Sequence, residues 1–145
     1  MTIWTKLAAY ASLETKRLLL RPFTSADGQA FYQIVSNPDN LAFIFPVKTS
    51  QEEAENLMVE MFMRTPLGKW AIIAKETQQL IGAISFEKLD ERTRQAELGY
   101  FIQKEARGQG LATEAVKSLS FLALYQLSLT DISIIAHLEN RASQR

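Results

Sequence analysis

The spacing of hydrophobic positions changes along the chain, and these changes predict the order of the elements. A short apolar run over residues 18–23, with a proline near its end, predicts a first strand. Thr24 or Ser25 then caps a helix that runs to about Val35, because short polar side chains accept hydrogen bonds from first-turn amides. The turn-forming residues 37–40 end this helix.

A second helix is predicted from a capping box at Ser50. Its hydroxyl can accept from the amide of Glu53, while the Glu53 carboxylate reaches back toward the start of the helix. The helix should continue to about Arg64 and present one apolar face. Its members, at helical spacing, are Leu57, Met58, Met61 and Phe62.

The period then changes to that of strands. Three apolar segments separated by polar turns predict an antiparallel meander, and they cover residues 70–75, 80–86 and 95–102. A glycine-rich loop, a helix over residues 111–127 and a β-branched strand over 131–137 follow. Because a helix joins the last two strands, they should run parallel. The chain is therefore predicted to be one domain of the α/β class, built on a mixed sheet.

Composition narrows the classes of function. The chain has 145 residues, which suits one domain, and 47% of them are hydrophobic, which allows a core. Its formal net charge is zero, which argues against a general nucleic-acid binder. It lacks cysteine, and a single histidine, His137, argues against a metal site. No apolar run approaches a membrane span, so a cytoplasmic protein without membrane partners is expected.

The loop after the third meander strand has the features of a phosphate-binding turn. First-turn amides of a helix have no intrahelical acceptor, and Gly108 and Gly110 allow a close approach and positive φ. The candidate donors are the amides of Gly108, Gln109, Gly110, Leu111, Ala112 and Thr113, with Arg107 on the rim. Neither the P-loop nor the dinucleotide fingerprint fits, since the lysine and the third glycine are missing. The alternative is a tight strand-to-helix turn without a ligand.

Three motifs resemble those of the GNAT superfamily of N-acetyltransferases. They are the run Glu-Leu-Gly-Tyr-Phe-Ile at 97–102, the run Arg-Gly-Gln-Gly-Leu-Ala-Thr-Glu-Ala at 107–115, and Asn-Arg-Ala-Ser at 140–143. The opening residues 13–23 resemble the branch that acetylates ribosomal-protein N-termini. The resemblance implies a mostly antiparallel sheet with helices on both faces, and acetyl-coenzyme A as co-substrate. One departure is Glu105, an acid where the family pattern has Gln or Arg.

The resemblance also implies a cofactor site along the strand before the loop. The backbone of Tyr100, Phe101 and Ile102 would pair with the pantetheine arm, and an amide there would hold the developing oxyanion. Gly99 would permit a bulge. Asn140 would contact the pantetheine or order the cofactor, and its alternative role is a plain helix cap.

The implied reaction is direct attack of a primary amine on the thioester, on a protein N-terminus or a small molecule. Glu97 is the candidate base, and its alternative is an exposed carboxylate or salt-bridge partner. Ser143 would protonate the leaving thiolate, or else only cap a helix. The set Tyr32, Phe43, Phe45 and Trp70 would line an acceptor pocket or belong to the core. The cluster Lys16, Arg17 and Arg21 is expected to be a solvated face.

The chain ends at Arg145, shortly after the last motif. Family members continue with the rest of a helix and two more strands, so a sheet that lacks its last two strands is expected. An exposed sheet edge then predicts dimerisation, strand exchange or marginal stability. The competing function is a module that binds acetyl-coenzyme A or a protein partner without turnover.

Overall fold

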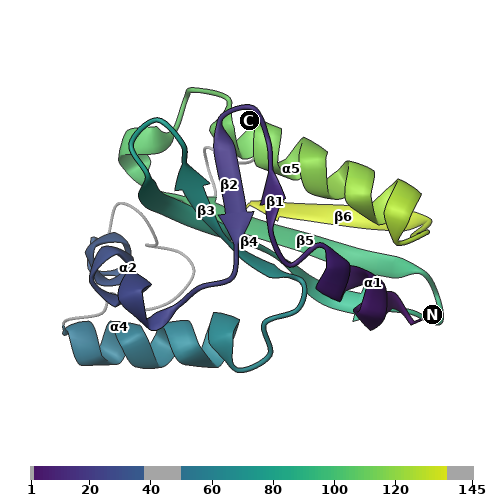
Figure 1. Ribbon diagram of the computed structural model, residues 1–145, viewed down its shortest axis with the longest axis horizontal. Helices are drawn as coiled ribbons and strands as arrows, with labels where there is room; N and C mark the ends of the chain where they lie inside the picture. The colour runs from purple at the N-terminus through teal and green to yellow at the C-terminus, as the bar shows by residue number, and fades with distance from the viewer. Residues whose placement is uncertain (1, 38–49, 137–145) are drawn as a thin grey trace.

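Six strands form one sheet in the computed structural model, which describes residues 2–37 and 50–136. The strands lie side by side in chain order, with every pair from β1 to β5 antiparallel and the pair β5–β6 parallel (Figure 1). Their bounds are β1 Leu13–Glu14, β2 Leu18–Arg21, β3 Lys69–Ala74, β4 Gln79–Asp90, β5 Gln95–Ile102 and β6 Asp131–Ala136. The predicted mixed, mostly antiparallel sheet is confirmed.

Helices cover both faces of this sheet. Helices α2 and α4 pack on each other at one face, while α5 and the short α1 lie over the other (Figure 1). The bounds are α1 Ile3–Ala9, α2 Gly28–Val35, α4 Gln51–Met58 and α5 Leu111–Phe121; wider π-type turns extend α4 through Val59–Met63 and α5 through Leu122–Gln126. Strand alternation divides β5 between two cores, with Leu98 and Ile102 facing α5 and Phe101 facing α2 and α4.

Local sequence signals fix the starts of α2 and α4. The Ser50 hydroxyl accepts from the amide of Glu53 at 3.2 Å, as the capping box predicts. Before α2, a single 3-10 turn places the Asp27 carboxylate against the amide of Thr24 at 2.8 Å. Asp27 is buried, and its two carboxylate oxygens accept hydrogen bonds from Nη1 and Nη2 of Arg21, each at 2.8 Å. Arg21 is thus half-buried and paired, so its assignment to a solvated face was wrong.

The N-terminal segment forms two elements that the pattern did not predict. Helix α1 buries Ile3 and Leu7 in the core that α5 also covers, and β1 pairs with β2. The indole of Trp70 donates to the carbonyl of Tyr10 at 3.1 Å and ties this segment to β3. Since α1 has only seven residues, its stability comes from these tertiary contacts.

The predicted bulge at Gly99 was wrong. Gly99 pairs in register with Ser85 on β4 and with Ile135 on β6. The irregularity lies on β4 instead, between Phe86 and Lys88. The extra residue is Glu87, which is exposed, so the bulge removes no apolar side chain from the core. Gly99, in contrast, is paired with a strand on each side.

Candidate active site

The glycine-rich loop has the geometry that phosphate binding requires. It joins the end of β5 to the start of α5, with Gly108 at φ +80° and Gly110 at φ +77°, both in the left-handed region. Gly110 is the N-cap of α5 and offers no side chain to its amides, so the amides of the first turn are not capped by it. A β-carbon on Gly108 would meet nothing within 4 Å, so the loop is open on that side.

The loop is folded back onto the end of β5. Arg107 Nε donates to the carbonyl of Ile102 at 3.0 Å, and Gln109 Nε2 donates to the carbonyl of Glu105 at 3.3 Å. Glu105 itself is exposed on the short turn Lys104–Ala106. Glu105 stands where the family pattern has Gln or Arg, but its carboxylate accepts none of these hydrogen bonds. The backbone donors of the loop therefore keep their positions.

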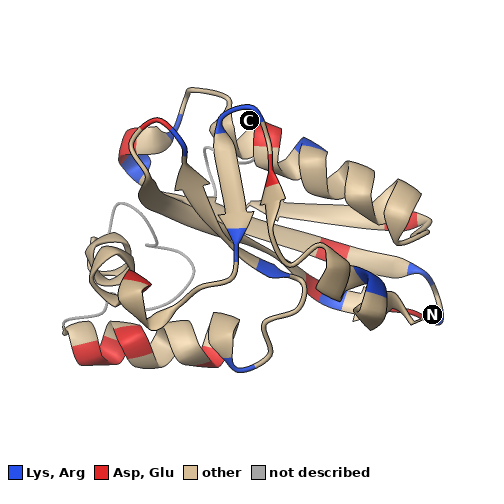
Figure 2. Cartoon of the chain, viewed as in Figure 1, with Lys and Arg blue, Asp and Glu red and all other residues tan. Residues whose placement is uncertain are grey.

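Arg17 contacts this loop from the turn between β1 and β2. Its side chain is 45% exposed, so the predicted solvated position is confirmed, and it is paired as well. Its Nη1 donates to the carbonyl of Gln109 at 2.8 Å and its Nε to Glu114 Oε1 at 2.7 Å. The amide of Arg17 and the hydroxyl of Thr15 donate to the other oxygen of Glu114. Figure 2 shows the blue β1–β2 turn beside the red position near the start of α5. Lys16 and Arg17 are thus both exposed, as a solvated face requires, whereas Arg21 is half-buried.

Hydrogen bonds set the ionisation of Glu114. Burial alone would raise the pKa of this carboxyl, but the hydrogen bonds from Thr15 and Arg17 and the charge of Arg17 lower the pKa to about 2. The carboxylate is therefore ionised at any physiological pH. The sequence contained one clue to this network, an acid in the first turn of a helix, where the helix dipole favours an ionised carboxylate.

Two of the three residues predicted to face pantetheine lie beyond the described pairing with β6. The register of β5 with β6 ends at Tyr100 opposite Ala136, so no described β6 residue pairs with Phe101 or Ile102. The carbonyl of Ile102 accepts from Arg107. Tyr100 is half-buried, and this burial raises the pKa of its phenol. The pantetheine role of this segment stays a prediction.

Gly82 on β4 supports this segment, and the sequence analysis missed it. A β-carbon there would lie 2.1 Å from the carbonyl oxygen of Phe101 and 3.0 Å from Cα of Ile102. No side chain fits into that space, because both neighbours are backbone atoms. A glycine inside an apolar strand is a signal of such a close backbone approach.

Glu97 projects from the same face of β5 as Phe101 and forms an ion pair. Its carboxylate lies 3.2 Å from Lys88 Nζ, with 26% of the Glu97 side chain and 78% of the Lys88 side chain exposed. The two residues line a shallow cavity of about 270 Å³ that Asp131 and Ser133 also border. The alternative of a salt-bridge partner is thus observed. Because Lys88 is so exposed, the pair is weak and leaves the carboxylate accessible.

The remaining predicted site residues divide into two groups. Trp70 is fully buried, so its core alternative is confirmed, and Tyr32 packs partly buried against the core under α2 and α4. The others, Phe43, Phe45, Asn140 and Ser143, lie outside the described residues, as does His137, which was not expected to be a site residue.

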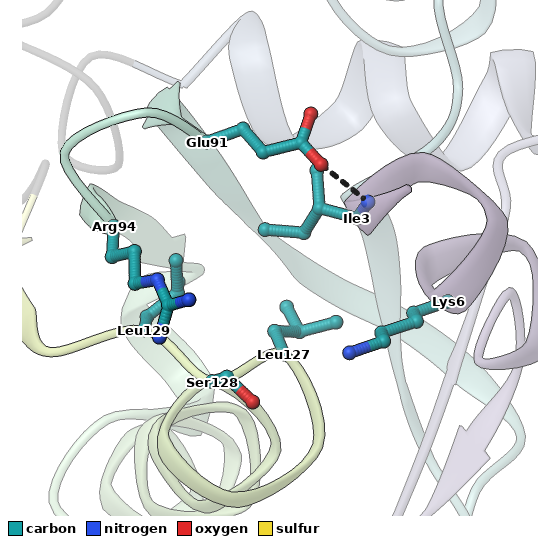
Figure 3. A pocket seen from close by; sticks show the side chains of 7 residues that line it. All are labelled: Ile3, Lys6, Glu91, Arg94, Leu127, Ser128 and Leu129. Atoms are coloured by element: carbon teal, nitrogen blue, oxygen red, sulfur yellow. Dashed lines mark hydrogen bonds between the residues drawn. The ribbon is translucent and has the colours of Figure 1, made fainter. Parts of the chain in front are cut away.

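A second cavity, of about 210 Å³, is lined by residues of α1, of the turn before β5 and of the segment after α5 (Figure 3). Lys6, Arg94 and Ser128 border it, and Glu91 closes it by accepting from the amide of Ile3 at 3.0 Å. That contact satisfies an amide at the start of α1 that has no acceptor within the helix.

Among the described residues no group of three His, Cys, Asp or Glu side chains could hold a metal ion. None of the described helices is long and apolar enough to cross a membrane.

Comparison with known proteins decides the family. The model of the acetyltransferase (GNAT) domain matches residues 17–145. The chain belongs to the GNAT family. It is 31% identical over 137 residues to the uncharacterized N-acetyltransferase YoaA of Bacillus subtilis, covering 92% of this chain and 77% of that relative. The resemblance predicted from the motifs is confirmed, and the chain is an acetyltransferase.

Two further relatives act, by name, on ribosomal proteins. The ribosomal-protein-serine acetyltransferase of Escherichia coli is 37% identical over 51 residues, which cover 35% of this chain and 28% of that protein. A solved structure from Vibrio cholerae, provisionally named a ribosomal-protein-serine acetyltransferase, superposes with a TM-score of 0.78 at 26% identity. That match covers 99% of this chain and 80% of the other.

Proposed function

We propose that this GNAT member transfers an acetyl group from acetyl-coenzyme A to the N-terminal amine of a protein or peptide. The loop carries the proposal: two left-handed glycines lead into a helix start without a side-chain cap. Such a helix start binds anions, and the open space beside Gly108 leaves room for a pyrophosphate. The names of two relatives favour a peptide acceptor over a small amine.

In this proposal the loop and the end of β5 hold the co-substrate. The amides of Gly108, Gln109, Gly110, Leu111, Ala112 and Thr113 donate to the pyrophosphate, with Arg107 on the rim. The backbone of Tyr100, Phe101 and Ile102 pairs with the pantetheine arm. An amide of that segment polarises the thioester carbonyl, since a fixed donor stabilises the oxyanion that forms there.

Glu97 removes a proton from the attacking amine, directly or through water. It lies five residues before Ile102, about 16 Å along the strand at the usual rise per residue. Its side chain is 26% exposed, so an acceptor amine or a water molecule can reach the carboxylate. The predicted roles of Asn140 at the pantetheine and of Ser143 at the leaving thiolate stay predictions, as do the cytoplasmic location and the homodimer.

A thiol-release assay over a panel of peptide N-termini and small amines tests this function. Turnover with a subset of peptides, dependent on acetyl-coenzyme A, is the expected result. Binding of acetyl-coenzyme A without thiol release on any acceptor would favour the alternative, a binding module. Turnover confined to small amines would refute the peptide acceptor and retain the enzyme.

A further inference from the structure

A single side chain from the start of the sheet joins the loop to the first turn of α5. Arg17 lies 92 residues before Gln109 and 97 residues before Glu114, yet it hydrogen-bonds both. The β1–β2 turn that carries it lies beside the start of α5 (Figures 1 and 2). The turn is also fastened by Lys75 Nζ, which donates to the carbonyl of Thr15 at 2.7 Å.

The fork of Arg17 restrains the loop at more than one point. Nε donates a hydrogen bond to the carboxylate of Glu114, and Nη1 donates to the carbonyl of Gln109. The second bond fixes the peptide group between Gln109 and Gly110. The third nitrogen, Nη2, lies 3.3 Å from the place where a β-carbon of Gly110 would be. The guanidinium therefore lies directly against the residue whose left-handed conformation starts α5.

The same contacts neutralise an acid that opposes phosphate binding. Glu114 lies in the first turn of α5, among the amides that would donate to the pyrophosphate. An ionised carboxylate there repels an incoming anion unless a cation is held beside it. Arg17 supplies that cation at 2.7 Å; its side chain is 45% exposed and that of Glu114 is 18% exposed, so solvent screens the pair in part while the contact keeps the two charges together.

We propose that Arg17 is a positioning residue of the cofactor site, which holds the Gln109–Gly110 peptide in its binding conformation and cancels the charge of Glu114. The β1–β2 turn is then part of the acetyl-coenzyme A site although it contributes no residue to the loop. This inference rests on the proposed function, because it takes the loop as the pyrophosphate site.

Calorimetric titration with acetyl-coenzyme A tests the inference on the variants Arg17→Met, Glu114→Gln and the double variant. Arg17→Met should weaken binding about tenfold or more, since it frees the loop and leaves the carboxylate uncompensated. The double variant should recover part of that loss, because no charge remains to repel the phosphate, while the loss of the Arg17 contact to the Gln109 carbonyl persists. Glu114→Gln alone should bind at least as tightly as the unmodified chain. Lys16→Ala, an exposed neighbour, is the matched control and should change nothing.

The outcomes separate the inference from the proposed function. If the unmodified chain does not bind acetyl-coenzyme A, the proposed function fails. If it binds and Arg17→Met binds equally well, only the inference fails. A double variant as weak as Arg17→Met would overturn the charge argument, since a purely structural loss is not reversed by a second change. Arg17→Lys keeps the positive charge but cannot donate to Glu114 and Gln109 from separate nitrogens as the guanidinium does. Its affinity for acetyl-coenzyme A is expected to lie between those of the unmodified chain and Arg17→Met. Should Arg17→Met not fold, an unchanged affinity in Arg17→Lys would overturn the inference.

Discussion

Replacing Gly82 by alanine should disturb the strand segment that the proposal assigns to pantetheine. The added methyl would lie 2.1 Å from the carbonyl oxygen of Phe101, a separation that forces the backbone to move. Overpacking of this kind costs about 1–3 kcal/mol. The lower entropy of the unfolded chain returns about 0.4–1 kcal/mol. The net loss of stability is therefore about 1–2 kcal/mol, a fall of about 3–8 °C in Tm for a chain of this size.

The effect on acetyl-coenzyme A should exceed the effect on stability. Both backbone atoms that the methyl would contact belong to Phe101 and Ile102. A displacement of about 1 Å misaligns the amides that pair with pantetheine, and such a shift can cost up to about a hundredfold in rate. The KM for acetyl-coenzyme A should rise about tenfold or more, while the KM for the acceptor changes little.

Gly28→Ala is the matched control for this variant. The three atoms nearest to its methyl would all belong to the Glu55 side chain, the first at 2.8 Å, and that flexible side chain can swing away. Because Gly28 begins α2, alanine should be neutral or stabilise by at most about 1 kcal/mol. Thermal melting and steady-state kinetics measure both variants. A Gly82→Ala protein with unchanged Tm and unchanged KM for acetyl-coenzyme A would refute the reasoning.

Four further predictions concern catalysis, acid stability, the N-terminal helix and assembly. Glu97→Gln should lower kcat about a hundredfold and leave the affinity for acetyl-coenzyme A unchanged, and an unaltered kcat would exclude Glu97 as the base. The pKa values of Asp27 and Glu114 are lowered from 3.8 and 4.5, Glu114 to about 2. Both carboxylates therefore stabilise the fold above about pH 4.5, and this contribution is lost as the pH falls toward 2. Urea midpoints that stay level from pH 5 to about 2.5 would contradict this. Glu91→Ala should cost about 1 kcal/mol and expose α1 to proteases, because it removes the acceptor of the Ile3 amide; unchanged proteolysis would count against it. Sedimentation should give twice the 16.4 kDa chain mass if the predicted homodimer forms, and a monomer mass at micromolar concentration would refute it.

Much of the fold followed from local patterns. The capping box at Ser50, the meander of β3, β4 and β5, and the strand-loop-helix around Gly110 depend on residues close together in sequence. Their periodicity and turn chemistry therefore suffice to predict them. The glycines at 108 and 110 were expected to permit positive φ, and both adopt it.

The remaining features depend on contacts between distant parts of the chain. Helix α1 is stabilised because Ile3 and Leu7 are buried in the core. The local spacing of residues does not predict this burial. The pairing of Arg17 with Glu114 was not predicted, because the two residues lie 97 positions apart in the sequence. Gly82 was passed over because the close approach of Phe101 arises only when β4 and β5 pair. The sequence supplied the types of residue at the site, whereas tertiary pairing decides which of them touch.

The most direct test of the account is the affinity of the Gly110→Val variant for acetyl-coenzyme A, measured by calorimetry beside the unmodified chain and Gly68→Val. Gly110 and Gly68 both have φ near +80°, a conformation in which valine strains the backbone, but only Gly110 lies in the loop. The account predicts that Gly68→Val loses stability and keeps its affinity for acetyl-coenzyme A, while Gly110→Val loses binding. Equal affinity in Gly110→Val and the unmodified chain would contradict the assignment of this loop as the cofactor site.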